Sequence, residues 1–403
     1  MSEFEFIQRM IEPNDTKIVL LILDGLGGLP RTPDGLTELE TARRPNMNAL
    51  AKRASLGLTI PVAPGITSGS GPGHLGIFGY DPIIHEIGRG ALEALGIDFD
   101  LRPEDVAARG NFCTLAPDGT IADRRAGRLS TPEAMRAAKI LNNLKVDGAQ
   151  VFVEPVKEHR FALVLRGAGL GAGISETDPL KTGVAPLVAL GKDAPSQKTA
   201  AIVNEFMAKA RAALAEESPA NGILLRGFDK LPILPTFQEL YQLNPAAIAI
   251  NGMYKGVARL AGMQILPVIG GTTIADEIAT LEQHWKDFDF FYIHVKQTDT
   301  AGEDGDFDRK VRVIEEVDAL LPRITALNPD VFIISGDHSS PAVLKFHSWH
   351  PVPTLLYSPH ARPDGITEFG ERACLHGSLG ILPARHIMPI ALAHAHRLAK
   401  FGA

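Results

Sequence analysis

Cysteine is nearly absent from this sequence. Only Cys113 and Cys374 are present among 403 residues, and they lie far apart in the chain. A disulfide framework is therefore not expected, and reduced thiols are typical of a cytosolic protein. Long apolar runs are missing too, because none approaches the roughly 18 residues of a transmembrane helix. The first residues include Glu3, Glu5 and Arg9 and lack a signal-peptide core. We expect a soluble, cytoplasmic protein with no membrane partner.

The sequence also lacks any block of lysine or arginine. Its formal net charge is −7, which makes nucleic acid an unfavourable partner. An anionic substrate is not excluded, because a local group of arginines can override the sign of the whole chain. Hydrophobic residues make up 45% and charged residues 22% of the chain. This balance is typical of a soluble globular enzyme.

The length and the alternation of elements indicate two domains. A chain of 403 residues is long for a single hydrophobic core. Strands at 17–23, 247–250, 290–294 and 331–334, with helices at 45–54, 254–261 and 307–327, follow an α/β rhythm. Between these parts we expect a hairpin at 110–128, strands at 151–153 and 161–165, and helices at 132–144 and 198–216. We therefore predict an α/β core with a mostly parallel sheet, residues 1–100 and 222–403, interrupted by an inserted α+β domain, residues 101–221.

The most informative motif is Asp337-His338, which follows the apolar strand at 331–334, with His347 further along. A parallel strand that ends in Asp and His places an oxygen and an imidazole ligand at the carboxyl edge of the sheet, where such sheets bind ligands. A hydrogen-bonded loop pair would show the same two residues. The motif gains weight because other segments offer matching chemistry.

Three such segments stand out. Asp24 ends the first strand, although Asp-Gly is also a common turn pair. Ser70 lies between glycines in Thr67–His74, which leaves its hydroxyl open, but a flexible loop with an N-cap serine fits equally. Asp299 and Glu303 are spaced so that one helical turn would point both carboxylates the same way. The alternative is that these residues form only an acidic loop, which ends where Asp306 caps the next helix.

Taken together, these segments predict a metal site. Mixed carboxylate and imidazole ligands suit Mn²⁺, Zn²⁺ or Mg²⁺, and Mg²⁺ is the least suited to two imidazoles. Two ions close together would lower the pKa of a serine and neutralise a phosphoryl group during its transfer.

The order of these motifs resembles the alkaline phosphatase superfamily and, within it, the archaeal-type cofactor-independent phosphoglycerate mutases. The resemblance runs nearly from end to end. It includes Gly79-Tyr80-Asp81-Pro82, Gly88–Ala94, Arg109–Phe112, Asp123–Arg128, Ser175–Pro179 and His347-Ser348 before Pro351-Val352-Pro353. It implies a three-layer core of the alkaline phosphatase type. From the split architecture and the arginines of the inserted domain, we expect that domain to close over the core, exclude water and hold the substrate.

The resemblance also implies roles for individual residues. Ser70 would be the nucleophile that forms a phosphoserine, with Lys296 and His74 near the transferred group. Two divalent ions would be needed and 2,3-bisphosphoglycerate would not. The implied ligands are Asp24, Ser70, Asp337 and His338 for one ion and Asp299, Glu303 and His347 for the other. The substrate, a small phosphorylated three-carbon acid, would be bound by Asp123, Arg124, Arg128 and Arg166. Assembly into a homo-oligomer is left open.

The sequence departs from the family pattern in a few places. Glu303 stands where many relatives have a histidine, and this carboxylate should favour harder ions. Gly71-Pro72 follows the serine where an Asp-Thr pair is often found, and His350 stands where an Asp is expected. Two alternatives therefore remain: a phosphotransferase or phosphatase acting on another small phosphorylated metabolite, and a non-catalytic metal-binding relative.

Overall fold

The computed structural model describes residues 3–402, which form two compact units. The first unit comprises the chain up to Glu86 together with the part from Leu234 onward, and the second comprises Ile87–Ile233. The borders expected near residues 100 and 221 therefore lie inside the second unit. The segment 87–100 carries α5 (Arg89–Gly96), whose Ala91 and Ala94 pack against Ala107 and Ala162 of the second unit.

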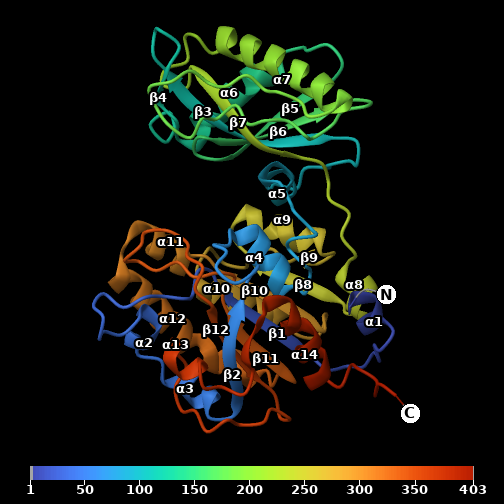
Figure 1. Ribbon diagram of the computed structural model, residues 1–403, viewed down its shortest axis with the longest axis vertical. Helices are drawn as coiled ribbons and strands as arrows, with labels where there is room; N and C mark the ends of the chain where they lie inside the picture. Colours follow the sequence, from blue (N-terminus) through green and yellow to red (C-terminus); the bar gives the residue numbers. More distant parts are fainter. Residues whose placement is uncertain (1–2, 403) are drawn as a thin grey trace. The chain divides into compact units, whose positions relative to one another are not determined.

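The first unit is built on an eight-stranded sheet in the order β13-β2-β12-β11-β1-β10-β8-β9 (Figure 1). Only β12 runs antiparallel to its neighbours, so the sheet is mostly parallel, as predicted. Its strands are β1 (Ile18–Leu23), β2 (Ala54–Ile60), β8 (Pro245–Ala249), β9 (Gln264–Ile265), β10 (Phe290–Val295), β11 (Val331–Ser335), β12 (Val352–Tyr357) and β13 (Gly380–Pro383).

Helices cover both faces of this sheet and give the core three layers (Figure 1). On one face, Leu39, Met47, Ile278 and Ile314 of α2, α3, α10 and α12 pack against strand residues such as Phe291. On the other face, the rings of α4 and α8 meet those of β10. The helices of this unit are α1 (Glu3–Gln8), α2 (Glu38–Thr41), α3 (Pro45–Ala51), α4 (Ser70–Ile77), α8 (Phe237–Tyr241), α9 (Gly252–Leu260), α10 (Ile274–His284), α11 (Gln297–Asp304), α12 (Phe307–Ala326), α13 (Glu371–Cys374), the 3₁₀ turn η1 (Ala384–His386) and α14 (Ile387–His394).

The register of the central strands positions the site. β1, β10 and β11 are apolar and buried on both faces, which is typical of parallel strands under two helix layers. Leu23 pairs with Val295, and Ile22 pairs with Ser335. The three strands therefore end at the same edge, and the polar residues that follow them are neighbours.

The second unit is an antiparallel five-stranded sheet with helices on both faces. Its order is β4-β3-β6-β5, and β7 also pairs with β3. The α6 and α7 helices pack on one face and α5 on the other. The elements are β3 (Val106–Leu115), β4 (Ile121–Asp123), α6 (Thr131–Asn142), β5 (Gln150–Lys157), β6 (Arg160–Arg166), α7 (Ala194–Ala213) and β7 (Gly222–Asp229).

Two expectations about individual elements are wrong. Residues 222–225 were expected to begin the second part of the core, but they form part of β7, which pairs antiparallel with β3 in the second unit, where Ile223 lies opposite Phe112. An apolar run in the sequence indicates that a strand is buried, but it does not indicate which sheet the strand joins. The helix expected through residue 54 ends at Ala51, and Ala54 already opens β2, which is held between β12 and β13. Within residues 3–402, no helix is long and apolar enough to cross a membrane.

Candidate active site

Segments that are remote in sequence meet at the carboxyl edge of the first unit's sheet. Asp24 follows β1, Lys296 follows β10, and Asp337 and His338 follow β11. Ser70 is the first residue of α4. Gly73, one turn later, lies so close to the Asp337 carbonyl that a Cβ atom there would clash with it, so glycine is what allows α4 to approach this edge.

One group of donor atoms lies where β1 and β11 end. Nε2 of His338 is 3.2 Å from Oδ1 of Asp24 and 3.3 Å from Oδ2 of Asp337. Oγ of Ser70 is 3.1 Å from the same nitrogen, and all four side chains are buried. Donor atoms held about 2.1 Å from one ion lie roughly 3 Å from one another. The spacing of Asp24, Asp337 and His338 is therefore that of a metal-ligand set.

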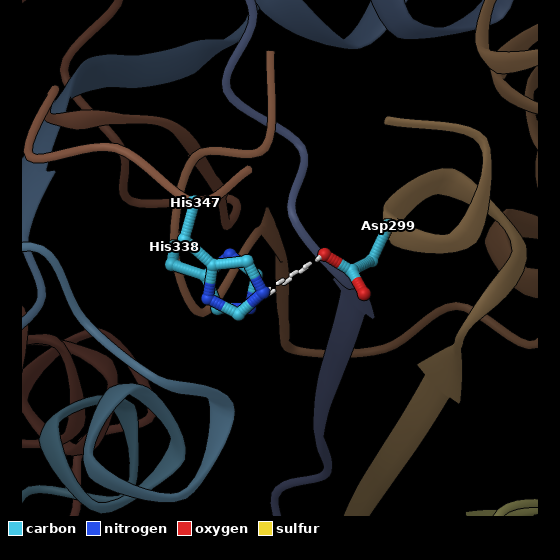
Figure 2. Close-up of side chains that lie close together, drawn as sticks. All are labelled: Asp299, His338 and His347. Carbon is cyan, nitrogen blue, oxygen red and sulfur yellow. Dashed lines mark ion pairs between the residues drawn. The ribbon is translucent and has the colours of Figure 1, made fainter. Parts of the chain in front are cut away.

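A second group adjoins the first through His338 (Figure 2). Nε2 of His347 is 3.4 Å from Oδ1 of Asp299 and 3.5 Å from Oε1 of Glu303. Nε2 of His338 is 3.9 Å from the same Asp299 oxygen. Asp299 and Glu303 lie one turn apart on α11, as their spacing predicted. Asp306 is the N-cap of α12, also as predicted.

The chemistry of these residues fits a divalent cation. Oδ1 of Asp24 and Oδ2 of Asp337 are buried and accept no well-aligned hydrogen bond, although imidazole nitrogens of His338 and His74 lie 3.2 Å from them. A buried carboxylate oxygen without a donor is unfavourable by about 1–3 kcal/mol, and a bound cation would relieve that cost. The mixed oxygen and nitrogen donors suit Mn²⁺ or Zn²⁺ in particular.

Lys296 contributes positive charge between the two groups. Its Nζ is 3.1 Å from Oδ2 of Asp24 and 2.5 Å from Oδ2 of Asp299. Burial disfavours the charged ammonium, but the two carboxylates outweigh burial and raise its pKa. Burial likewise opposes ionisation of Asp24, yet Lys296 together with His294 and His338 holds the pKa of Asp24 well below its usual value.

His347 and Glu303 of the second group form an ion pair that shifts the pKa of both side chains. Burial opposes a charge on His347, but its ion pair with Glu303 and the nearby Asp299 raise its pKa to about 9. The same contact with His347 lowers the pKa of Glu303. Burial, reinforced by Asp24, raises the pKa of Asp299. A protonated His347 cannot be a metal ligand, so binding of an ion at Nε2 must displace this proton.

His74 contacts the backbone of Ser70 and the carboxylate of Asp337, and the nitrogen that makes these contacts does not bond to the serine hydroxyl. Its Nδ1 is 2.8 Å from the backbone oxygen of Ser70 and 3.2 Å from Oδ2 of Asp337. The imidazole is fully buried and packs against the rings of Tyr254 and Tyr292.

Two stacked rings of the site, those of Tyr254 and His294, were not among the predicted residues. The hydroxyl of Tyr254 donates to Oγ of Ser70 at 3.3 Å. The ring of Tyr254 stacks on His294 with centroids 3.5 Å apart, and Nε2 of His294 is 3.1 Å from Oδ2 of Asp24. The only available signal was His294 inside an otherwise apolar strand, which burial alone would disfavour.

A buried lysine was missed as well. Lys310 of α12 is fully buried, and its Nζ donates to the backbone oxygens of Gly25, Gly27 and Ser340. These bonds tie the loop after Asp24 to the loop after His338. In the helical pattern, Lys310 looked like an ordinary surface residue.

The predicted substrate-binding residues Asp123, Arg124, Arg128 and Arg166 all lie in the second unit. Arg124 forms a two-pronged ion pair with Asp178, and Arg166 forms one with Asp105.

The other two predicted residues lie at the end of β4 and in the loop that follows it. Asp123 accepts hydrogen bonds from the backbone of Arg125 and Gly127, and the side chain of Arg128 is exposed.

Other arginines of the second unit are less well paired. Arg109 of β3 and Arg226 of β7 are partners in register, and the Nε atom of each is buried without a hydrogen bond. Burial and the neighbouring Arg160 lower the pKa of Arg109 to about 9. Burial and Arg89 lower that of Arg226. Glu93, whose Oε1 is 3.6 Å from Nε of Arg109, offsets part of this charge. A cluster of arginines with an excess of positive charge has the electrostatics of an anion site.

Comparisons with known proteins agree with this chemistry. The family model described as 2,3-bisphosphoglycerate-independent phosphoglycerate mutase matches residues 51–221. Proteins from Thermus thermophilus and Thermotoga neapolitana are each 50% identical over 406 residues, with 100% of both chains covered. Both are described as "Probable 2,3-bisphosphoglycerate-independent phosphoglycerate mutase".

Solved structures give the same result. A Pyrococcus horikoshii protein superposes with a TM-score of 0.84 at 32% identity, covering 97% of this chain and 100% of that one. The cofactor-independent phosphoglycerate mutase of Thermoplasma acidophilum superposes with a TM-score of 0.70 at 30% identity, covering 94% and 99%. This chain therefore belongs to the family of 2,3-bisphosphoglycerate-independent phosphoglycerate mutases.

Proposed function

We propose that this chain interconverts 3-phosphoglycerate and 2-phosphoglycerate through a phosphoserine at Ser70, with two divalent ions and without 2,3-bisphosphoglycerate. The observation that carries the proposal is the position of the Ser70 hydroxyl, 3.1 Å from Nε2 of His338. His338 belongs to both donor groups, so the serine lies against the place where they adjoin.

Each ion would be held by one donor group, with His338, which borders both groups, assigned to the first. Asp24, Ser70, Asp337 and His338 would hold one ion, and Asp299, Glu303 and His347 the other. Divalent ions bound there would lower the pKa of the serine hydroxyl and neutralise charge on the transferring phosphoryl group.

In the first step, Oγ of Ser70 attacks the phosphorus of 3-phosphoglycerate. The Oγ–P bond forms, and the bond between phosphorus and the oxygen on carbon 3 breaks. The proton that Ser70 loses is balanced by the proton that the carbon-3 oxygen gains. Glycerate then lies beside a phosphoserine.

In the second step, the 2-hydroxyl oxygen of glycerate attacks the phosphoserine. The P–Oγ bond breaks, the bond from phosphorus to the carbon-2 oxygen forms, and the hydroxyl proton is balanced by the one returned to Ser70. Lys296, with its ammonium between Asp24 and Asp299, would neutralise charge on the phosphoryl oxygens. His74 would keep Asp337 and the first turn of α4 in place, a role supported by its contacts with both.

The second unit would retain the intermediate. Water competes with glycerate for the phosphoserine, and its attack would turn a mutase into a phosphatase. We propose that this unit caps the core, excludes water and binds the substrate anions. Arg124, Arg128 and Arg166, with Asp123, are the residues expected from the sequence. The Nε atoms of Arg109 and Arg226 are buried without a hydrogen bond, although Oε1 of Glu93 is 3.6 Å from that of Arg109, and this favours the second pair as additional anion ligands.

A coupled assay tests the proposal. Purified protein with Mn²⁺ should convert 3- to 2-phosphoglycerate without added 2,3-bisphosphoglycerate. Release of inorganic phosphate without 2-phosphoglycerate would instead identify a phosphatase, and neither product would identify a non-catalytic relative. Ser70→Ala should abolish turnover and keep the fold. Ser55→Ala is the matched control, since Ser55 lies in β2 and its hydroxyl donates to the backbone carbonyl of Arg362. Activity retained in Ser70→Ala would contradict the proposal.

A cytoplasmic location is part of the same proposal. Cys113 and Cys374 are both free and buried, which agrees with a reducing compartment.

A further inference from the structure

The hydroxyl of Tyr254 lies against the nucleophile. Tyr254 is in the first turn of α9, is 1% exposed, and donates to Oγ of Ser70 at 3.3 Å. We propose that Tyr254 is a catalytic residue whose hydroxyl donates a hydrogen bond to Oγ of Ser70 and so stabilises the charge on that oxygen as its bond to phosphorus forms and breaks. This inference rests on the role of Ser70 proposed above.

The ring of Tyr254 is held in place independently of its hydroxyl. It stacks on the imidazole of His294, with ring centroids 3.5 Å apart and an interplanar angle of 22°. On its other sides it meets the ring of His74 at 5.0 Å and Nζ of Lys296 at 5.3 Å from its centroid. His294 is itself fixed by its bond to Asp24. The phenol is therefore preorganised, so it does not have to reorient during the reaction.

The direction of the hydrogen bond follows from the reaction. Oγ of Ser70 carries partial negative charge in both transition states, first as the attacking oxygen and then as the leaving oxygen. A phenol that donates to this oxygen binds it more strongly in the transition states than in the phosphoserine ester, where Oγ bridges carbon and phosphorus and the charge lies on the non-bridging oxygens. Tyr254 keeps its proton throughout, so the proton balance of the two steps is unchanged.

Tyr254→Phe tests the inference, because phenylalanine keeps the ring and its stacking on His294 and removes only the hydroxyl. We expect kcat to fall about 10- to 100-fold, with KM within about twofold of wild type, because the interaction is made in the transition states. Acid-quenched single turnovers should show formation of the phosphoserine slowed by a similar factor. Affinity for Mn²⁺ by calorimetry should stay within about twofold, since the ring and the ligands are intact.

Tyr241→Phe is the matched control. This buried tyrosine of α8 donates instead to the carbonyl of Phe78, so its variant should keep the wild-type kcat. Replacing Tyr254 by p-aminophenylalanine restores an N–H donor at the same place and should recover part of the lost kcat. That rescue would not be expected if the hydroxyl served only to fill space.

The outcomes separate this inference from the proposed function. If Ser70→Ala is inactive and Tyr254→Phe retains a kcat within twofold of wild type, the inference is wrong and the proposed function stands. A large rise in KM, or a loss of Mn²⁺ affinity in Tyr254→Phe, would show a structural role and overturn it. Should Tyr254→Phe fail to fold, the p-aminophenylalanine variant tests the inference instead. Because its N–H is a weaker donor than the phenol, this variant should have a lower kcat at an unchanged KM. A wild-type kcat in this variant would refute the inference.

Discussion

The imidazoles of His338 and His347 stack on each other, with centroids 3.8 Å apart and an interplanar angle of 20° (Figure 2). The two rings come from one loop and face different carboxylates. His338 is closest to Asp24 and Asp337, and His347 lies beside Asp299 and Glu303. Because His338 is common to both groups and His347 belongs only to one, the two histidines should not be equivalent for metal binding.

Calorimetric titration with Mn²⁺ tests this asymmetry. His347→Ala should weaken the ion held with Asp299 and Glu303 at least about tenfold and leave the other near wild type. His338→Ala removes a ligand of the other ion and, because Nε2 of His338 is also 3.9 Å from Oδ1 of Asp299, should weaken both. His284→Ala, which removes a half-buried histidine that pairs with Asp287 in the first unit, is the control and should bind like wild type. Equal effects of the two ligand variants would contradict the division into two groups.

Glu303 should influence the choice of metal. A carboxylate favours harder ions than an imidazole does, so Glu303→His should raise the affinity for Zn²⁺ relative to Mn²⁺ by about tenfold. Competition against a chromophoric chelator measures the ratio. Asp304→His is the matched control, because the neighbouring Asp304 pairs with Arg309. A ratio unchanged in Glu303→His would show that this position does not set the preference.

Lys310 should stabilise the loops that carry the ligands. Lys310→Met removes the ammonium donor from three buried carbonyls, of which those of Gly25 and Gly27 keep a second donor, the backbone N–H of Ser340. We expect the free energy of unfolding to fall by about 2–4 kcal/mol and Mn²⁺ affinity to fall with it. Urea denaturation of the apoprotein gives the first quantity and calorimetry the second. Lys198→Met, at an exposed lysine bonded to the Ala168 carbonyl, should change neither. A Lys310→Met protein as stable as wild type would contradict this role.

Glu277 should make stability depend on pH. It is 1% exposed, and burial followed by the charge of Asp276 raises its pKa from 4.5 to about 9. Between these values the folded state binds a proton that the unfolded state has lost, so the free energy of unfolding should fall with rising pH, by about 1.4 kcal/mol per unit. Glu277→Gln cannot titrate and should lose this slope. Parallel curves for the two proteins from pH 5 to 9 would refute the assignment.

The sequence predicts the central strands and the long helix of the first unit because the patterns that indicate them lie within single short segments. Apolar runs identified β1, β10 and β11, and the helical pattern at 307–327 corresponds to α12. Since parallel strands end at one edge, Asp24, Asp337 and His338 were expected together, and they are.

What the sequence could not give depends on packing between remote elements. Tyr254 lies in a helix whose pattern is that of any amphipathic surface helix, and only the stacking on His294 places its hydroxyl at Ser70. Lys310 reads as a solvated residue until three loop carbonyls surround it. The pairing of β7 with β3 was missed because a strand's partner depends on long-range register, which one apolar run does not encode.

The central claim is that Ser70 carries the phosphoryl group between the two positions of the substrate. Its most direct test is acid quench during turnover of 3-phosphoglycerate with a radiolabelled phosphoryl group, followed by proteolysis and peptide mapping. The account predicts acid-stable label on the peptide that contains Ser70, formed and lost at rates no slower than kcat. Turnover without label on the protein, or label on any other residue, would contradict it.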